Sequence, residues 1–254
     1  MMRLFSVTAV LLCLLLRPVV AETAAEAVPV VTVAVQGQLL QFEQRPRLLD
    51  VLQHAQLDER TYWPAARLYR DSPGLIEQQQ QFIAELQQLQ QHFLARKQRK
   101  QANAVHALLV QVRSWQLAEP VMVPVDLDRA RAALQHNPRL DAGHYLLQLP
   151  VRPQWVYPAG LYQETAPLAH KRLSMVGAYL TTGYRLPLAD INQVLLLQPD
   201  GSQQWVGVAY WNRQRIAVQP GAQILVPFGP RALPAKYRHL NQMLIDLAMH
   251  RVFE

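Results

Sequence analysis

Two neighbouring stretches, QPDGSQQWVGVAYWN at 198–212 and VQPGAQILVPF at 218–228, decide the fold of the second half of the chain. Pro-Asp-Gly at 199–201 is a turn, because proline fixes φ, aspartate bonds its own backbone and glycine accepts a positive φ. Apolar and aromatic residues resume after this turn, and a second turn, Pro-Gly at 220–221, leads into another apolar run. We predict three strands here. Because no catalytic residue type is concentrated among them, they indicate a small β-domain that presents surface.

The first 21 residues predict a secretory signal. A short basic start is followed by an apolar run at 4–16 and by small residues, with cleavage expected after Ala21. The run is too short for a membrane span, and the alternative is an uncleaved N-terminal anchor. The only cysteine, Cys13, lies in this signal behind Leu12, where a lipoprotein signal has a small residue. We therefore expect no lipid anchor, and no disulfide or cysteine metal site in the mature chain.

The sequence is basic, with 25 Lys and Arg against 18 Asp and Glu. Outside one short segment at 96–103 the basic residues are scattered, whereas a nucleic-acid binder gathers them on one face. We expect no nucleic-acid partner. An anionic glycan or the surface of a bacterial membrane suits this charge balance better.

Residues 22–151 predict a first β-domain. Strands at 28–35 and 39–42 flank a turn, a helical pattern begins at Pro46, and a hairpin followed by a packed helix begins a β-grasp arrangement. A further strand is expected at 62–69, where Pro64 confines it to an edge or a bulge. Gly143 begins another strand.

A helical hairpin is predicted within this domain, at about 73–117. An apolar seam with one polar member steps by four, three, four, three and four residues: Leu75, Gln79, Phe82, Leu86, Leu89 and Phe93. A second stripe follows at Val105, Leu108, Val112 and Trp115. The segment between the stripes, 96–103, is polar and basic. We therefore expect two antiparallel helices with an exposed basic tip.

The second domain is predicted at 152–230, behind the boundary segment Pro-Val-Arg-Pro at 150–153. It repeats the plan of the first, with a strand at 154–161, a helix at 173–180 and then the strands quoted at the outset. Residues 231–254 carry an amphipathic terminal helix, too charged to span a bilayer alone. That helix docks either on its own protein or on a partner or membrane. The fold class is α+β, with two β-grasp-like domains.

No catalytic constellation is visible, so we expect no catalytic residues, no metal site and no cofactor. The chain lacks a phosphate-binding glycine-rich loop and a G-x-S-x-G elbow, and no two His with a Glu between them are spaced for a helical zinc site. Asp126 and Asp128 could hold a cation, but a short D-x-D beside a helix start is more often an N-cap. A pair of carboxylates for glycoside hydrolysis remains an open alternative, because the two residues need to be close in space and not in the sequence.

The aromatic residues of the opening stretch are candidates for contact with a glycan or a partner. Trp205, Tyr210 and Trp211 form either a platform for sugars or one face of the core. The best candidates for contact with a glycan or a partner are Trp211, Asn212 and Arg213, at a strand end, together with Arg152.

Several of these features together resemble the GfcC family (YjbG-like) of capsule and exopolysaccharide biosynthesis proteins. They are the signal, the β-grasp half, the Gln-rich hairpin, LPVRPQWVYPAG at 149–160, and the two opening stretches. The resemblance implies two β-grasp domains, a hairpin inserted in the first, a terminal amphipathic helix and a soluble periplasmic protein. Such domains are similar to those of Wza-type export proteins, whose terminal helix crosses the outer membrane in an oligomeric barrel. This chain lacks their lipobox, and the family offers no catalytic residues to carry over.

We therefore expect a non-enzymatic periplasmic accessory protein of capsule or exopolysaccharide assembly and export. It would contact the capsular glycan or the export machinery through its second β-domain or its terminal helix. The helix could also contact the periplasmic face of the outer membrane. One alternative is an acidic-glycan-binding module without an export role, using Trp211, Arg213 and Arg152. A second is a cryptic polysaccharide hydrolase.

Overall fold

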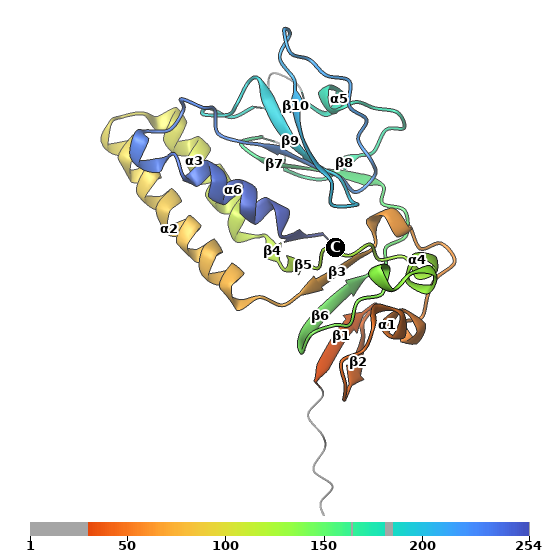
Figure 1. Ribbon diagram of the computed structural model, residues 1–254. Helices are drawn as coiled ribbons and strands as arrows, with labels where there is room; N and C mark the ends of the chain where they lie inside the picture. Colours follow the sequence, from red (N-terminus) through yellow and green to blue (C-terminus); the bar gives the residue numbers. More distant parts are fainter. Residues whose placement is uncertain (1–29, 164, 181–184, 254) are drawn as a thin grey trace, which may run out of the picture.

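The computed structural model describes residues 30–163, 165–180 and 185–253; the predicted signal lies outside the described residues. Two mixed five-stranded sheets, a helical hairpin and a terminal helix make an α+β architecture in two domains (Figure 1). A two-stranded sheet joins the chain end to the hairpin. Within the described ranges, no helix combines the length and the hydropathy needed to cross a membrane.

The first sheet has the strand order β2-β1-β6-β3-β5. Its strands are β1 (Val31–Val35), β2 (Gln38–Phe42), β3 (Arg67–Arg70), β5 (Glu119–Pro120) and β6 (Gly143–Gln148). The central pair, β1 and β6, is parallel, and the other pairs are antiparallel. Helices α1 (Leu48–His54) and α4 (Leu127–Ala132) pack together beside it, and their apolar residues join those of the sheet in a cluster of its own.

The second sheet has the order β10-β9-β11-β7-β8. Its strands are β7 (Trp155–Gly160), β8 (Leu168–Ala169), β9 (Gln193–Leu197), β10 (Gln203–Gly207) and β11 (Gln223–Val226). Read from β8, this order repeats that of the first sheet: the first and last strands pair in parallel at the centre, and every other pair is antiparallel. The repeat expected from the sequence is present in strand order and direction.

Several predicted elements are shorter than expected, among them the terminal helix of segment 231–254, of which only α6 (Leu240–Met249) forms. The strand predicted at 62–69 begins only at Arg67, because Pro64 lies in a 3₁₀ turn, η1 (Trp63–Ala65), which replaces its first half. The helix predicted at 173–180 is a single turn, α5 (Val176–Tyr179). Leu173 has a left-handed φ of 59° and Met175 is extended and bridged to Ala217, so neither can belong to the helix.

The hairpin forms as its apolar stripes predict, from α2 (Pro73–Ala95) and α3 (Arg99–Arg113). The apolar members of the first stripe are all buried, and the tip residues 96–100 are exposed. The one polar member, Gln79, donates through Nε2 to the carbonyl oxygens of Val112, at 2.8 Å, and Trp115, at 3.0 Å. It therefore ties the start of α2 to the end of α3.

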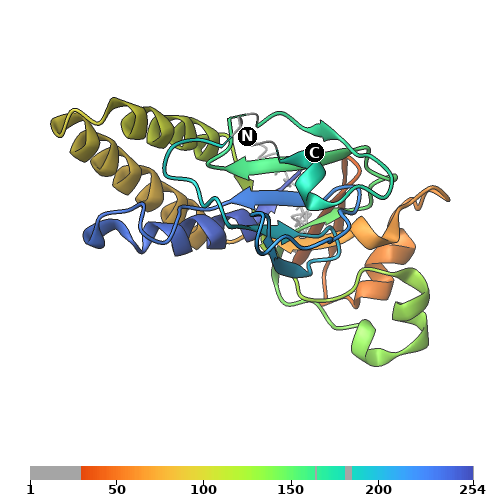
Figure 2. The ribbon, with the colours of Figure 1, turned by 90° about the horizontal axis from the view of Figure 1, so that it is seen from above.

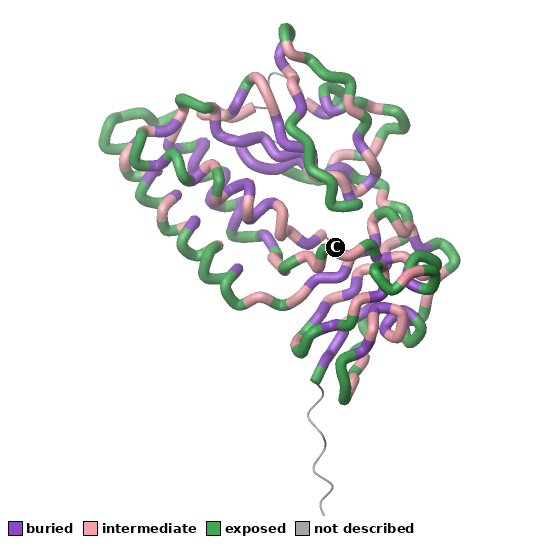
Figure 3. Tube along the Cα trace, in the orientation of Figure 1, coloured by how far each residue is buried: buried purple, intermediate pink, exposed green. Residues whose placement is uncertain are grey.

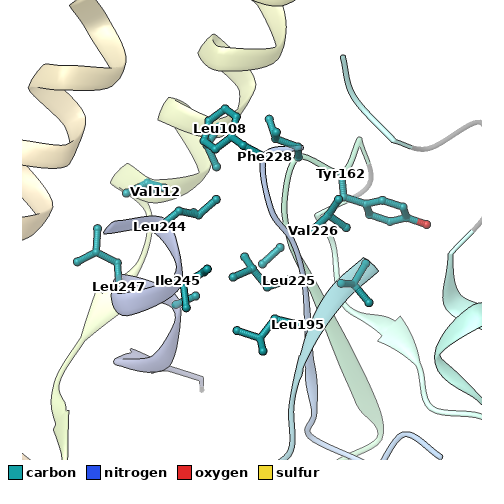
Figure 4. Close-up of a cluster of buried hydrophobic side chains, with 14 of the residues drawn as sticks. Leu108, Val112, Tyr162, Leu195, Leu225, Val226, Phe228, Leu244, Ile245 and Leu247 are labelled. Atoms are coloured by element: carbon teal, nitrogen blue, oxygen red, sulfur yellow. The ribbon is translucent and has the colours of Figure 1, made fainter. Parts of the chain in front are cut away.

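The hairpin packs on the second domain, although in the chain it lies between β3 and β5. One apolar cluster contains residues of α2, α3, the second sheet and α6 (Leu240–Met249), which lies along the hairpin in both views (Figures 1 and 2). Figure 3 shows this buried layer running between the sheet and the helices. In Figure 4, Leu108 and Val112 of α3 and Leu244 and Ile245 of α6 face the second sheet.

The terminal helix thus docks on its own protein. Its buried residues are Leu240, Leu244, Ile245, Leu247 and Ala248. The chain then continues as β12 (Arg251–Val252), which pairs with β4 (Gln116–Leu117) just after the hairpin. Two further single turns are η2 (Leu134–His136) and η4 (Ala235–Tyr237).

Candidate functional site

A cleft of about 870 Å³ lies where the two domains meet. It is lined by β3 and β6 of the first sheet, by the connection 149–154, by β7, β11 and the 197–201 turn of the second sheet, and by the chain end at 248–253. Its volume is typical of ligand-binding pockets, which are often found between domains.

Two arginines that line the cleft make contacts near the domain boundary, and one of them joins the two domains. Arg67 of β3 donates through Nε to the carbonyl oxygen of Pro199, at 2.8 Å, and through Nη2 to that of Gln198, at 3.3 Å. The Pro-Asp-Gly turn of the second domain therefore rests on the first sheet. Arg152, in the domain connection, lies 5.3 Å from the ring centroid of Tyr62.

A third arginine, Arg251 of β12, is held between aromatic rings. Its Cζ lies 4.6 Å from the ring centroid of Phe253 and 5.3 Å from that of Trp115. Phe253 in turn stacks on Tyr157, with centroids 4.1 Å apart. Burial lowers the pKa of Arg251 to about 10, although the neighbouring Tyr157 opposes this shift. The planar guanidinium suits such stacking, which fixes its position.

Arg251 has no acidic partner among the described residues. None of the ion pairs formed there includes it, and its Nη1 is buried without a hydrogen-bond partner. Arg251 is only partly buried, and a cation that has lost part of its hydration is normally paired, because an unpaired charge is less well solvated there than in water.

A buried amide, Gln223, lies in the same wall. It is on β11, directly opposite Tyr157 of β7, so both side chains share one face of the sheet. Gln223 is only 2% exposed, and neither its Nε2 nor its Oε1 has a hydrogen-bond partner among the described residues. An amide with both functions free inside a domain is rare, since buried polar groups are almost always satisfied.

The other lining residues are amides, aromatics and apolar groups, with one carboxylate. The glutamines are Gln36, Gln148, Gln154, Gln198, Gln203 and Gln223. Tyr69, Trp155, Tyr157, Phe253 and His250 supply rings, and Glu119 is the one acidic residue among the described residues that line the cleft. In the described part of the chain, no three or more His, Cys, Asp and Glu gather as a metal site would need. This arrangement can bind polar and anionic groups beside apolar faces.

The predicted contact residues do not come together. Arg152 lines the cleft, whereas Trp211, Asn212 and Arg213 belong to the loop after β10, at the opposite end of that strand from cleft-lining Gln203. Asn212 shapes its own loop: Oδ1 accepts from the backbone N–H of Ala209, at 2.9 Å, and Nδ2 donates to the carbonyl oxygen of Asn192, at 3.0 Å. The contact role of these four residues stays a prediction.

The aromatic residues of the opening stretch are on the surface. Trp205 is 43% exposed, Trp211 72% and Tyr210 91%, so the core alternative does not hold for them. The N-cap interpretation of Asp126 is confirmed, since its Oδ1 accepts from the backbone N–H of Arg129, at 2.9 Å.

Sequence reasoning missed most of the cleft. Arg67, Tyr157 and Arg251 come from three distant segments, and Arg251 lies within the segment 231–254 that was predicted to carry the terminal helix, although α6 ends before it and β12 contains it. One signal was present: Gln223 interrupts the apolar run that becomes β11, where a fully buried strand position would normally carry an apolar side chain.

Comparison with known proteins identifies the family. Residues 24–154 match the family model described as "Capsule biosynthesis GfcC, N-terminal", and residues 163–253 match "Capsule biosynthesis GfcC C-terminal". A curated relative, "Uncharacterized protein YjbG" of Escherichia coli (strain K12), is 27% identical over 194 residues, which cover 76% of this chain and 77% of the relative. From both matches, over both domains, it follows that the chain belongs to the GfcC family of capsule biosynthesis proteins.

Proposed function

We propose that this protein is a non-enzymatic periplasmic accessory protein in the assembly and export of a capsule or exopolysaccharide. The observation that carries the proposal is the match of both domains to capsule biosynthesis family models. The predicted secretory signal supports a periplasmic location. In that location the protein would meet the polymer after its synthesis. We also infer that each sheet with its helix is a β-grasp unit, since both share one strand order around a central parallel pair.

The composition of the cleft supports a role without chemistry on the polymer. Glycoside hydrolysis usually needs two carboxyl groups that flank the scissile bond. Among the described residues that line the cleft, Glu119 is the only carboxylate. The cleft therefore favours binding over hydrolysis.

The partner would be the export machinery or the capsular glycan itself. The loop after β10, with Tyr210 and Trp211 exposed, is a surface for a protein partner. Contact with the periplasmic face of the outer membrane would use the outward polar face of α6, because its apolar face is occupied. The alternative of an acidic-glycan-binding module without an export role is favoured by the three arginines of the cleft.

A deletion in the organism that carries the gene tests this function. We expect the deletion strain to lose surface polysaccharide or to alter its chain length or its retention at the cell. The intact gene should restore the polymer, whereas a version without codons 2–21 should not, since its product would stay in the cytoplasm. Unchanged amount, length and retention in the deletion strain would reject the proposal.

A further inference from the structure

We infer that the cleft between the domains binds a carboxylate-bearing oligosaccharide, a segment of an acidic polysaccharide. Arg251 and Gln223 would bind it in the interior of the cleft, with Arg152 and Trp155 as further contacts. The inference deepens the proposed function and rests on it for the class of ligand.

The amide of Gln223 is the first reason. Within the described part of the chain its donor and its acceptor are both buried and unpartnered, and such atoms destabilise a protein unless something binds them. A sugar hydroxyl both donates and accepts, so two neighbouring hydroxyls can satisfy Nε2 and Oε1 together. Water could do the same, but the cleft that reaches this position has room for a much larger ligand.

The guanidinium of Arg251 is the second reason. It is held in place by the rings of Trp115 and Phe253 and has no acidic partner in the described residues. A carboxylate is the group that a fixed guanidinium binds best, through two parallel hydrogen bonds. The described residues that line the cleft include three arginines against one carboxylate, so an anionic ligand also improves the charge balance among them.

The third reason is the aromatic surface beside these groups. Trp155 lines the cleft and is 47% exposed, and Tyr157 follows two residues later on the same face of β7. A pyranose ring has an apolar C–H face, which can pack on the electron-rich face of an aromatic ring. Amide, guanidinium and exposed ring in one cleft therefore match a sugar that carries a carboxylate, and no single free anion would use all three.

Titration calorimetry on the full mature chain tests the inference. The probes are a hexamer of galacturonic acid, a neutral glucose hexamer of equal length, and inorganic phosphate. We expect the uronate hexamer to bind at least tenfold more tightly than the neutral hexamer, with an affinity that falls as salt is added. No binding of the uronate hexamer at low salt would overturn the inference, and so would phosphate binding as tightly as the hexamer, because the cleft would then be a simple anion site.

Variants locate the site. Gln223→Leu removes the unpartnered amide, so we expect it to fold at least as stably as the wild type and to weaken uronate binding about tenfold. Arg251→Lys keeps the charge but loses the planar fork, and should weaken binding by a similar factor. If Arg251→Lys does not fold, Gln223→Leu alone decides.

Matched controls lie in the loop after β10. Trp211→Ala and Arg213→Gln alter exposed residues away from the cleft and should change uronate affinity less than twofold. Unchanged binding in folded Gln223→Leu and Arg251→Lys, with lost binding in the loop variants, would overturn the assignment to the cleft. The readout also separates the two proposals: a deletion strain that loses its polysaccharide, together with a purified protein that binds no uronate, leaves the proposed function standing and rejects only the ligand.

Discussion

At the scale of single residues, Gly160 shows how tightly the backbone of the second sheet is packed. It ends β7 with a φ of +83°, and a Cβ placed there would lie 2.2 Å from the carbonyl oxygen of Val226 on β11. Its backbone N–H donates to Oε1 of Gln111 on α3, at 2.7 Å. The residue therefore joins the hairpin to the sheet at a point where a side chain cannot fit.

Gly160→Ala should destabilise the protein by roughly 3 kcal/mol or more, because a left-handed backbone and a clash with main chain add together. The measurement is urea unfolding followed by circular dichroism. Gly177→Ala is the matched control: this glycine lies in α5 with open space around its Cβ position, so alanine there should be neutral or stabilise by up to about 1 kcal/mol. Equal effects of the two substitutions would contradict the packing described for Gly160.

At the scale of elements, Gln79, the polar residue of the hairpin seam, connects the two helices by hydrogen bonds. Gln79→Leu would complete an apolar seam, yet it should destabilise the protein by about 1–2 kcal/mol. The reason is that the carbonyl oxygens of Val112 and Trp115 would lose their hydrogen-bond donor. A leucine at this half-buried position would also gain less stabilisation from apolar burial than a fully buried leucine does.

The neighbouring exposed residue provides the comparison for this prediction. Gln80→Leu should change the free energy of unfolding by less than about 0.5 kcal/mol, since Gln80 is exposed and makes no such bond. Thermal unfolding of both variants measures the difference. A Gln79→Leu protein more stable than the wild type would show that seam burial outweighs the two hydrogen bonds.

The elements that sequence predicted best are those with local periodicity. The hairpin is one, because spacing of apolar residues along a helix fixes its buried face before any tertiary contact is known. The single-turn α5 is a counterexample: the apolar residues at 173–180 have helical spacing, but Leu173 has a left-handed φ and Met175 is bridged to Ala217, in a loop distant in the sequence. Prediction of helix boundaries from sequence therefore fails where tertiary contacts determine the backbone conformation.

At the scale of the whole molecule, the cleft lay beyond prediction from one sequence. Arg67 meets Pro199, and Tyr157 stacks on Phe253, across separations that leave no periodic signal. The loop that contains Trp211 was predicted as a contact surface from its composition, because exposed aromatic residues often mark such surfaces. Its contact role stays a prediction. Of the cleft residues only Arg152 was a predicted contact, and Gln223 left a further signal, as a polar residue in a buried apolar strand.

The arrangement of the hairpin makes the two domains interdependent. In the chain it interrupts the first sheet, but its apolar residues share one cluster with the second sheet and α6, whereas the first sheet has a cluster of its own. Each fully buried leucine or valine contributes about 1.5–3 kcal/mol, and a domain is stable by only about 5–15 kcal/mol in all. Removing α3 alone would expose more apolar surface than the second domain can tolerate.

We therefore expect a fragment of residues 152–254 to fail to fold, even though it contains the whole second sheet and α6. It should bind a hydrophobic dye, lack a cooperative thermal transition and aggregate in sedimentation experiments, because Leu225, Phe228 and Leu244 lose the α3 residues that pack near them. A full-length chain in which 74–114 is replaced by a short Gly-Ser linker should show the same loss in the second domain, and the mature wild-type chain is the positive control. A monomeric fragment with a cooperative transition would mean that the hairpin covers the second sheet without being needed for its stability, so that the domains fold independently.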